Sequence, residues 1–533
     1  MLHLTSYLKQ GIERWKQLPR MLRSLVDRAE VRLHPQDPWK HYHLAKTLLQ
    51  LQEFQAAEFH YRRVIALDRS IALAHHELAD VLQAQGRLSE AEECYRQAIE
   101  LNEEFFWSYH NLGDVLRKQE KWSEAAETYK KASRFNPDFY PTYEHWSQVA
   151  VRSRRWEDAI FAYHRALELQ PDNFQICYDL AGLLRRFDRT TEVANLYLKT
   201  INLDPTFPWF YHHYFWRTLN TEGKLEEAIE RYKTALKSHP DSMEVYVNLG
   251  EALTHQKQIP EAITYYRTAL HRKLKRERPE IFSNEEVSES LETARKPDFI
   301  ILGAQKAGTS SLYFYLSKNP QILSPLRKEL EFWSWKFHRG IDWYFSQFPP
   351  LTPDSQFLTG EACPGYLDFD VAAERLKENS PNTKFIILLR NPVDRAVSHY
   401  YHWIRRHQED RSFDVAIQAK IMEIHQKGTV WNQHSNYVAR GVYVEFIRHW
   451  LSLFPREKFL ILKSEDFYQD PSKTLKKVDN FLGVPVSTLS EYKKHNAGSY
   501  SPVSQKSRDY LNDFYSPYNQ ELEKLLGIEL NWN

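Results

Sequence analysis

A tyrosine recurs at nearly constant intervals through the first half of this 533-residue chain. Small side chains, mostly alanine, stand four residues before each tyrosine and three residues after it, and a proline closes several of the copies. No single copy can bury its own apolar stripe, so neighbouring copies must stack into one continuous core. The tyrosines are 34 or 35 residues apart: Tyr61, Tyr95, Tyr129, Tyr163, Tyr197, Tyr232 and Tyr266.

The spacing predicts two packed helices in each copy. Small residues let the second helix approach the first closely, and the tyrosine fills the gap beside them. Gly86 and Gly223 are expected at the turns between paired helices, where a positive φ is often needed. The pattern resembles the tetratricopeptide repeat family, with seven repeats in residues 38–271 after a helical cap in residues 1–37. This resemblance implies an α-solenoid whose groove binds a peptide or a protein partner.

Composition narrows the functional classes. Lys and Arg number 71 and Asp and Glu 70, which argues against a nucleic-acid binder because such a protein normally carries a basic excess. The sequence contains no window of 18 apolar residues, so it predicts no transmembrane helix. The N-terminus lacks the apolar core of a signal peptide. The first thirty residues form a basic amphipathic pattern, expected to cap the repeats, with a membrane-surface anchor as the alternative.

The cysteines and histidines predict no metal site. The cysteines are far apart and form no C-x-x-C pair, which argues against zinc and disulfides and favours a reducing, cytoplasmic compartment. The histidines of the first half follow the repeat rather than a convergent ligand set, so we expect them to be packing or groove residues. The residues concerned are Cys94, Cys177, Cys363, His75, His76, His110, His212 and His213.

After the repeats the composition changes. Residues 272–296 are charged and poor in apolar side chains, which predicts a linker or a solvated helix rather than a nucleic-acid patch. An apolar run at 299–302 then leads into a loop bounded by Gly303 and Gly308, followed by a helix that opens with Thr309. This strand–loop–helix order directs a helix N-terminus and several backbone N–H groups at one spot, which is an anion-binding arrangement.

The nucleotide P-loop requires a lysine directly after its second glycine. Here that position is Thr309, and the lysine lies inside the loop at Lys306. The departure disfavours ATP or GTP, so a P-loop kinase is the weaker alternative.

The loop GAQKAGTSSL (303–312) resembles the 5′-phosphosulfate loop of sulfotransferases that use 3′-phosphoadenosine 5′-phosphosulfate (PAPS). KFIILLRNPVDRAVSHYYHW (384–403) resembles the 3′-phosphate motif of the same family. The resemblance covers residues 297–533 and implies an α/β P-loop-like domain with a central parallel sheet, PAPS as donor, and no metal. The PAPS-binding residues that it implies are Lys306, Ala307, Gly308, Thr309, Ser310, Arg390 and Ser398.

Within that family, the heparan sulfate N- and O-sulfotransferases are the most similar. SPLRKELEFW (324–333), followed by GIDWYFSQFP (340–349), resembles the part of those enzymes that faces the acceptor. This makes Glu329 the implied general base and Glu331 the runner-up. His402 falls where the N-sulfotransferases have an active-site histidine, and residues 496–500 resemble a loop that closes near the nucleotide. The tail lacks cysteine, and Ala362 stands after Glu361 where relatives often have lysine. A glycosaminoglycan acceptor therefore does not follow from the resemblance.

The sequence thus predicts an enzyme that moves a sulfuryl group from PAPS to a hydroxyl or amine. A carbohydrate acceptor is favoured, while a glycolipid, a protein tyrosine and a small alcohol stay open. The repeats would recruit either the acceptor or a partner protein, and a scaffold with a non-catalytic nucleotide domain is the alternative from another class. The order of domains resembles that of predicted bacterial proteins, especially cyanobacterial ones.

Overall fold

The computed structural model describes residues 20–279, 296–351, 355–406, 408–487, 492 and 502–532. Two compact units divide the chain. The first unit comprises residues 1–205 and 217–224, and the second comprises residues 206–216 and 225–533. The last helices predicted as repeats therefore belong to the same unit as everything that follows them.

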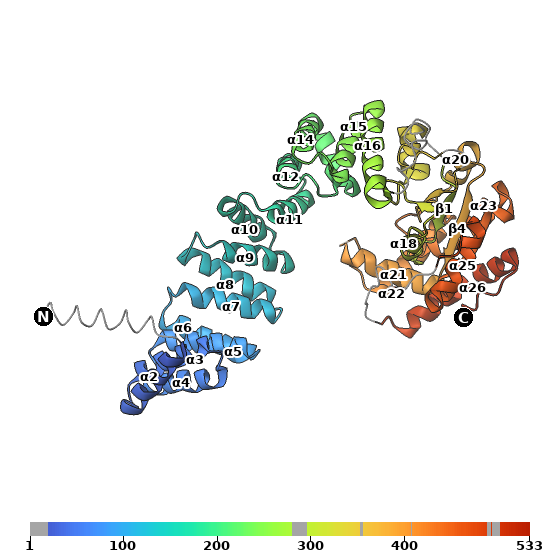
Figure 1. Ribbon diagram of the computed structural model, residues 1–533. Coiled ribbons are helices and arrows are strands. Elements are labelled where there is room, and N and C mark those ends of the chain that lie inside the picture. Colours follow the sequence, from blue (N-terminus) through green and yellow to red (C-terminus); the bar gives the residue numbers. More distant parts are fainter. Residues whose placement is uncertain are drawn as a thin grey trace. The chain divides into compact units, whose positions relative to one another are not determined.

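Helices alone make up the described part of the first unit, and successive pairs stack side by side (Figure 1). This arrangement confirms the predicted solenoid. A leading helix, α2 (Arg20–Leu33), precedes the pairs. The pairs are α3 (Pro38–Gln50) with α4 (Phe54–Leu67), α5 (Ala72–Ala84) with α6 (Leu88–Leu101), α7 (Phe106–Lys118) with α8 (Trp122–Phe135), α9 (Tyr140–Arg152) with α10 (Trp156–Leu169), and α11 (Phe174–Leu184) with α12 (Thr190–Leu203).

The recurring tyrosines and small residues meet as predicted. A Cβ atom added to Gly113 would lie 2.6 Å from Cε1 of Tyr129, so only glycine leaves room for that ring. Gly250 and Tyr266 repeat the relation at the same distance. Gly86, with a φ of 79°, turns the chain between two helices of a pair.

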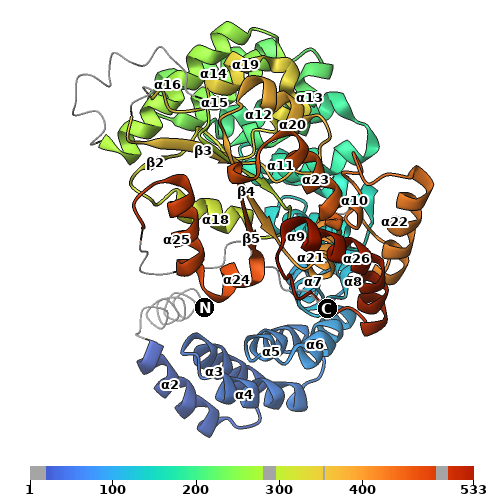
Figure 2. The same ribbon diagram turned by 90° about the vertical axis from the view of Figure 1, so that its right-hand side faces the viewer.

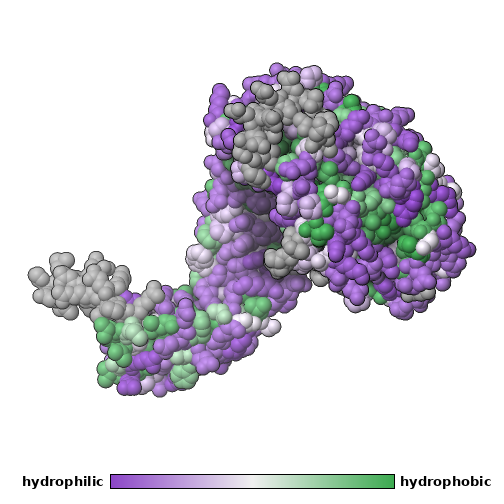
Figure 3. All heavy atoms as spheres, turned by 45° about the vertical axis from the view of Figure 1, so that its right-hand side comes forward, coloured by the Kyte–Doolittle hydropathy of each residue, from purple (hydrophilic) through white to green (hydrophobic). Residues whose placement is uncertain are grey.

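Apolar side chains remain exposed at the α2–α4 end of the first unit, where Figure 3 shows hydrophobic atoms beside hydrophilic ones. Residues 1–19 of the predicted cap lie outside the described residues. No described helix is both long and apolar enough to cross a membrane. The exposed side chains are Met21, Leu22, Leu25, Val26, Leu33, Trp39 and Phe59.

The second unit opens with the end of the repeat array. Helix α13 (His213–Thr221) is divided between the two units after Trp216. Helices α14 (Leu225–Ser238), α15 (Met243–His255) and α16 (Ile259–Glu277) follow in the second unit. Residues 272–277, predicted to begin a linker or a solvated helix, continue α16. Leu274 is buried, and the basic residues of the last turn lie where the helix dipole favours positive charge.

A five-stranded sheet, in the order β2-β3-β1-β4-β5 with every pair parallel, forms the rest of the unit. This confirms the predicted α/β class. The strands are β1 (Phe299–Gly303), β2 (Ile322–Leu323), β3 (Leu358–Ala362), β4 (Lys384–Leu389) and β5 (Phe459–Lys463). The helices are α18 (Thr309–Leu316), α19 (Ile341–Phe345), α20 (Ala372–Asn379), α21 (Pro392–Arg405), α22 (Phe413–Lys427), α23 (Tyr443–Leu453), α24 (Ser464–Gln469), α25 (Pro471–Leu482) and α26 (Gln505–Leu526).

Strands β1 and β4 are central and buried, as expected for continuous apolar runs in a parallel sheet covered on both faces. Figure 2 shows α18 and α25 on one side of the sheet, and α20 and α23 on the other. The chain leaves β1 toward one edge of the sheet and leaves β4 toward the opposite edge. Ligands of open parallel sheets bind at the carboxyl ends of such a pair of strands.

Candidate functional site

The loop that follows β1, residues 303–308, is fixed by neighbours on several elements. The amide of Ala304 donates to Leu388 O on β4 at 2.8 Å. Ser464 at the start of α24 donates its hydroxyl to the carbonyl of Ala307. Gly308 has a φ of 99°, and a Cβ atom there would lie 2.5 Å from the Tyr468 hydroxyl oxygen. The first turn of α18 is therefore held rigidly at the carboxyl end of β1.

Arg390, directly after β4, lies against this loop. Its Nη1 donates to the carbonyl oxygen of Lys306 at 3.1 Å, and its own carbonyl accepts from the Tyr443 hydroxyl at 2.9 Å. Asn391 then caps α21 by accepting from the amide of Val393 at 2.9 Å. The two predicted phosphate motifs thus meet at one place, and Ser398 lies half-buried on α21.

The predicted residues on the loop and α18 differ in accessibility. Ala307 and Thr309 are buried, whereas Lys306, Gly308 and Ser310 are half-buried. An anion at this end of the sheet would therefore meet backbone amides and the side chains of Lys306 and Ser310.

Positive charge accumulates beside the loop. Burial, and then the charges of Arg406 and Arg405, lower the pKa of Lys306 to about 8. Glu329 acts on that pKa in the opposite direction, which places its carboxylate within electrostatic reach of the lysine. Burial and then Lys306 lower the pKa of His402 to about 4, so this histidine is neutral at pH 7. A cationic group of this kind suits a polyanion and marks a candidate functional site.

Residues 324–339 include the first stretch predicted to face the acceptor and are called the acceptor-side segment below; their two acidic residues point outward. Glu329 and Glu331 have φ values of 59° and 54°. The intervening Leu330 is buried, and its amide donates to Glu361 Oε2 at 3.3 Å. The glutamate side chains remain 48% and 49% exposed, so either can reach a bound molecule.

Lys328 joins this segment to the glycine loop. Its Nζ donates to Ser310 Oγ at 2.6 Å and lies 2.5 Å from Glu329 Oε1. One lysine therefore bridges the first turn of α18 and the predicted base. Through Lys328, Glu329 is therefore linked to Ser310 in the first turn of α18.

A pocket of about 100 Å³ lies between the glutamates and the loop. Trp335 packs edge-on against Phe369 and His434, with ring centroids 4.9 and 4.7 Å away. Arg440 is buried, binds the Asp368 carboxylate at 2.7 and 2.8 Å, and donates to Gln305 Oε1 at 2.6 Å. The lining residues are Gln305, Glu329, Glu331, Ser334, Trp335, Cys363, Pro364, Gly365, His434 and Arg440.

The sequence prediction missed Trp335, His434 and Arg440. Each is an isolated residue in its own segment and belongs to no motif or regular spacing. Only the pairing of Arg440 with Asp368, and the packing of Trp335 on His434, reveal their shared location.

Glu361, at the carboxyl end of β3, accepts the hydrogen bond from the amide of Leu330 in the acceptor-side segment. Burial raises its pKa to about 7, while hydroxyls of Tyr344 and Tyr366 donate to Oε1 at 2.6 and 3.1 Å. It is fully enclosed, so its role is to hold the amide of Leu330 rather than to meet an acceptor. Residues 496–500, predicted to close near the nucleotide, lie outside the described residues.

One further group could offer ligands to a metal. Single ligand atoms of His110, Asp114 and His145 lie within 4.8 Å of one another. The Asp114 carboxylate already binds Arg117 at 3.3 Å and the Tyr129 hydroxyl at 2.6 Å. A cation so near disfavours a metal ion, and the group is explained by contacts between repeats.

Comparison with known proteins gives matches for both parts. Residues 296–513 match the sulfotransferase domain, and residues 41–71, 70–137, 146–205 and 221–279 match tetratricopeptide repeats. The membrane-associated sulfotransferase kil1 of Dictyostelium discoideum is 26% identical over 312 residues, which cover 44% of this chain and 66% of that protein. Bifunctional heparan sulfate N-deacetylase/N-sulfotransferase 3 of Homo sapiens is 31% identical over 267 residues, which cover 44% and 30%.

Among solved structures, a sulfotransferase from Alicyclobacillus acidocaldarius is 30% identical, with a TM-score of 0.40. The match covers 45% of this chain and 99% of that one. The chain spans less than two thirds of the length of the two curated relatives. Residues 296–513 belong to the sulfotransferase domain family, and tetratricopeptide repeats precede them.

Proposed function

We propose that the protein transfers the sulfuryl group of PAPS to a hydroxyl or amine, most favourably on a carbohydrate. The observation that carries this proposal is the contact of Arg390 with the Lys306 carbonyl, because it unites two phosphate motifs at one end of the sheet. The half-buried cation Lys306 lies beside further cations there. Such a group fits a donor that carries a 5′-phosphosulfate and a 3′-phosphate.

In this proposal the loop and the start of α18 bind the 5′ side of the donor. The amides around Ala307, Gly308, Thr309 and Ser310 donate to phosphate, and Lys306 meets the oxygens next to sulfur. Arg390 and Ser398 bind the 3′-phosphate, for which a planar guanidinium is well suited. No metal is needed, because these donors already oppose the charge of the leaving group.

The reaction follows from these positions. Glu329 removes a proton from the acceptor as the acceptor oxygen or nitrogen attacks sulfur, and the bond from sulfur to the phosphate oxygen breaks. The products are the sulfated acceptor, 3′-phosphoadenosine 5′-phosphate and a protonated glutamate. Lys306 and the loop amides stabilise charge on the departing oxygen. The Lys328 bridge holds Glu329 beside Ser310 of the proposed donor loop, which supports Glu329 over Glu331 as the base. Burial lowers the pKa of His402 to about 4, which makes this histidine a weak base.

A sugar acceptor is supported by the pocket beside the glutamates. Trp335 is exposed and could pack against the apolar face of a sugar ring. Arg440 and the carboxylates offer polar partners to its hydroxyls. A panel of carbohydrates, tyrosine peptides and small alcohols tests the acceptor class.

The proposal also covers the ligand of the repeats and the location of the protein in the cell. The repeat groove would bind a partner protein or the acceptor itself. A cytoplasmic location is supported by the cysteines Cys94, Cys177 and Cys363, which are free in the described structure.

Calorimetric titration with 3′-phosphoadenosine 5′-phosphate tests the donor first. We expect micromolar binding by the native protein, loss of binding in Arg390→Ala, and no binding of ATP with magnesium. Labelled PAPS would then be supplied with the acceptor panel. Failure to bind the bisphosphate, or preference for ATP, would contradict the proposed function.

A further inference from the structure

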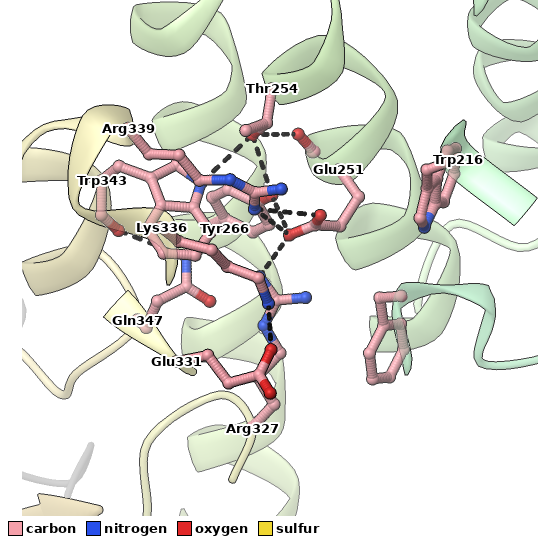
Figure 4. Close-up of polar contacts among 12 residues, drawn as sticks. Trp216, Glu251, Thr254, Tyr266, Arg327, Glu331, Lys336, Arg339, Trp343 and Gln347 are labelled. Carbon is pink, nitrogen blue, oxygen red and sulfur yellow. Dashed lines mark hydrogen bonds and ion pairs between the residues drawn. The ribbon is translucent and has the colours of Figure 1, made fainter. Parts of the chain in front are cut away.

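The last repeat contacts the acceptor-side segment through a buried carboxylate. Glu251 on α15 is 4% exposed at its side chain and binds Arg327 and Arg339, both of that segment (Figure 4). Arg339 Nη1 lies 3.2 and 3.3 Å from the two carboxylate oxygens. The hydroxyl of Tyr266 on α16 donates to Oε1 at 2.9 Å. All of these residues belong to the second unit.

The same carboxylate position recurs in earlier repeats with a different partner. Asp80 and Asp114 each accept from the hydroxyl of the tyrosine fifteen residues later, as Glu251 does from Tyr266. Their other partners come from the following repeat. Asn111 donates to Asp80 at 2.9 Å, and His145 lies 3.0 Å from Asp114. For Glu251, the acceptor-side segment supplies those partners instead.

A second set of contacts also joins the last repeat, α15 and α16, to the residues that follow Glu331. Trp343, in the middle of α19, is fully buried, and its Nε1 donates to Thr254 Oγ1 on α15 at 3.1 Å. Its ring meets that of Tyr266 edge-on at 6.0 Å, and the Arg339 guanidinium lies 4.7 Å from its centroid. Residues 327–343 therefore cover the last repeat as another repeat would, which meets the need of a solenoid for a capped end.

The two arginines held by Glu251 flank the exposed glutamates. Arg327 stands just before Glu329, and Arg339 stands after Glu331 in the same segment. Lys336, close to Glu331 at 3.3 Å, also faces this junction (Figure 4). We propose that Glu251 is a positioning residue of the sulfotransferase: by holding Arg327 and Arg339, it fixes both ends of the segment that carries Glu329 and Glu331. The last repeat is thereby a working part of the acceptor site.

The inference rests on the proposed function for its catalytic consequence. Loss of the carboxylate leaves two buried guanidiniums without their counter-charge, so the segment must rearrange. Small displacements of a base reduce turnover strongly, whereas Lys306 and Arg390 lie outside the segment. We expect Glu251→Gln to lower kcat by about tenfold to a hundredfold, with the bisphosphate Kd changed by no more than about twofold.

Glu92→Gln is the matched control. Glu92 is likewise buried and binds two cations, Arg96 at 2.5 Å and Lys121 at 2.8 Å, but it lies in the first unit. Both variants and Glu251→Asp would be compared in the full chain for bisphosphate Kd, kcat, acceptor KM and hydrogen exchange of residues 326–343. We expect faster exchange and lower kcat in Glu251→Gln, smaller changes of both quantities in Glu251→Asp, and neither change in Glu92→Gln.

Equal effects of Glu251→Gln and Glu92→Gln, or unchanged exchange in Glu251→Gln, would overturn the inference. If Glu251→Gln does not fold, Arg339→Gln removes one cation and leaves the Arg327 pair, and it should show the same changes in smaller degree. Native exchange rates in Arg339→Gln would equally overturn it. Failure of the native protein to bind the bisphosphate would instead contradict the proposed function, while the exchange experiment would still decide the positioning of the segment.

Discussion

The repeats and the sulfotransferase domain treat buried charge in opposite ways. In the repeats, each recurring carboxylate is matched by a tyrosine hydroxyl and by a group from the next copy, as Asp114 is by Tyr129 and His145. Beside the glycine loop, Lys306 instead lies among further cations that lower its pKa. Matched charges of this kind stabilise the fold, whereas an accumulation of one sign is a feature of candidate ligand sites.

The largest expected effect lies at the acceptor side. Glu329→Gln should reduce kcat by roughly a hundredfold or more, since the variant keeps the shape of the base but cannot take a proton. Glu331→Gln is the control, because it is equally exposed but does not contact Lys328. Turnover measured with labelled PAPS and the acceptor found in the panel decides between them. A larger loss of kcat in Glu331→Gln than in Glu329→Gln would identify Glu331 as the base instead.

Lys306→Ala should cut turnover by roughly a hundredfold, through loss of charge stabilisation at the departing oxygen. Its thermal unfolding should not become easier at pH 7, because the unliganded protein holds this lysine charged against burial and neighbouring arginines. Lost activity with unchanged or raised Tm would sharpen the contrast with the repeats. A destabilised variant would show that the lysine is structural.

The pH dependence of donor binding should follow Lys306. Its pKa of about 8 in the free protein is below the usual value for lysine, so the charge is present below pH 8 and lost above it. A bound polyanion favours the charged form. The bisphosphate Kd should therefore weaken, by up to about tenfold, as the pH rises from 7 to 9. Calorimetry in buffers of different ionisation enthalpy should detect proton uptake, and Lys306→Arg should flatten the profile.

The smallest effect on activity is expected in the first unit. Gly113→Ala places a methyl group against the Tyr129 ring and should destabilise that unit by about 1–3 kcal/mol through overpacking. Turnover per folded molecule should stay unchanged. Gly182→Ala on α11 is the control, because nothing lies within 4 Å of the added atom, and its Tm should hold or rise. Denaturant unfolding and turnover would be measured for both variants. A large loss of turnover in folded Gly113→Ala would show that the first unit contributes to activity and would contradict the prediction.

Local patterns explain what could be predicted. The helix pairs follow from small residues and tyrosines that pack within one copy, as Gly113 does on Tyr129. The charge along 272–277 left a linker and a solvated helix open, and only the structure shows that these residues continue α16 and that Leu274 is buried. The glycine loop and Arg390 were found as motifs, each of which is continuous in sequence. His402 was named from resemblance, and its neutral state follows from surroundings that the sequence does not state.

By itself, the sequence determined a repeat array, a glycine-bounded strand–loop–helix and the family of residues 296–513, because each of these depends on neighbours close in the chain. Only the tertiary structure decided which distant residues share a pocket, such as Arg440 with Gln305, or Trp335 with His434. It also decided the partners of Glu251, which by its repeat position resembles Asp80 and Asp114. A buried carboxylate must be matched by whatever covers it, and folding covers this one with Arg327 and Arg339.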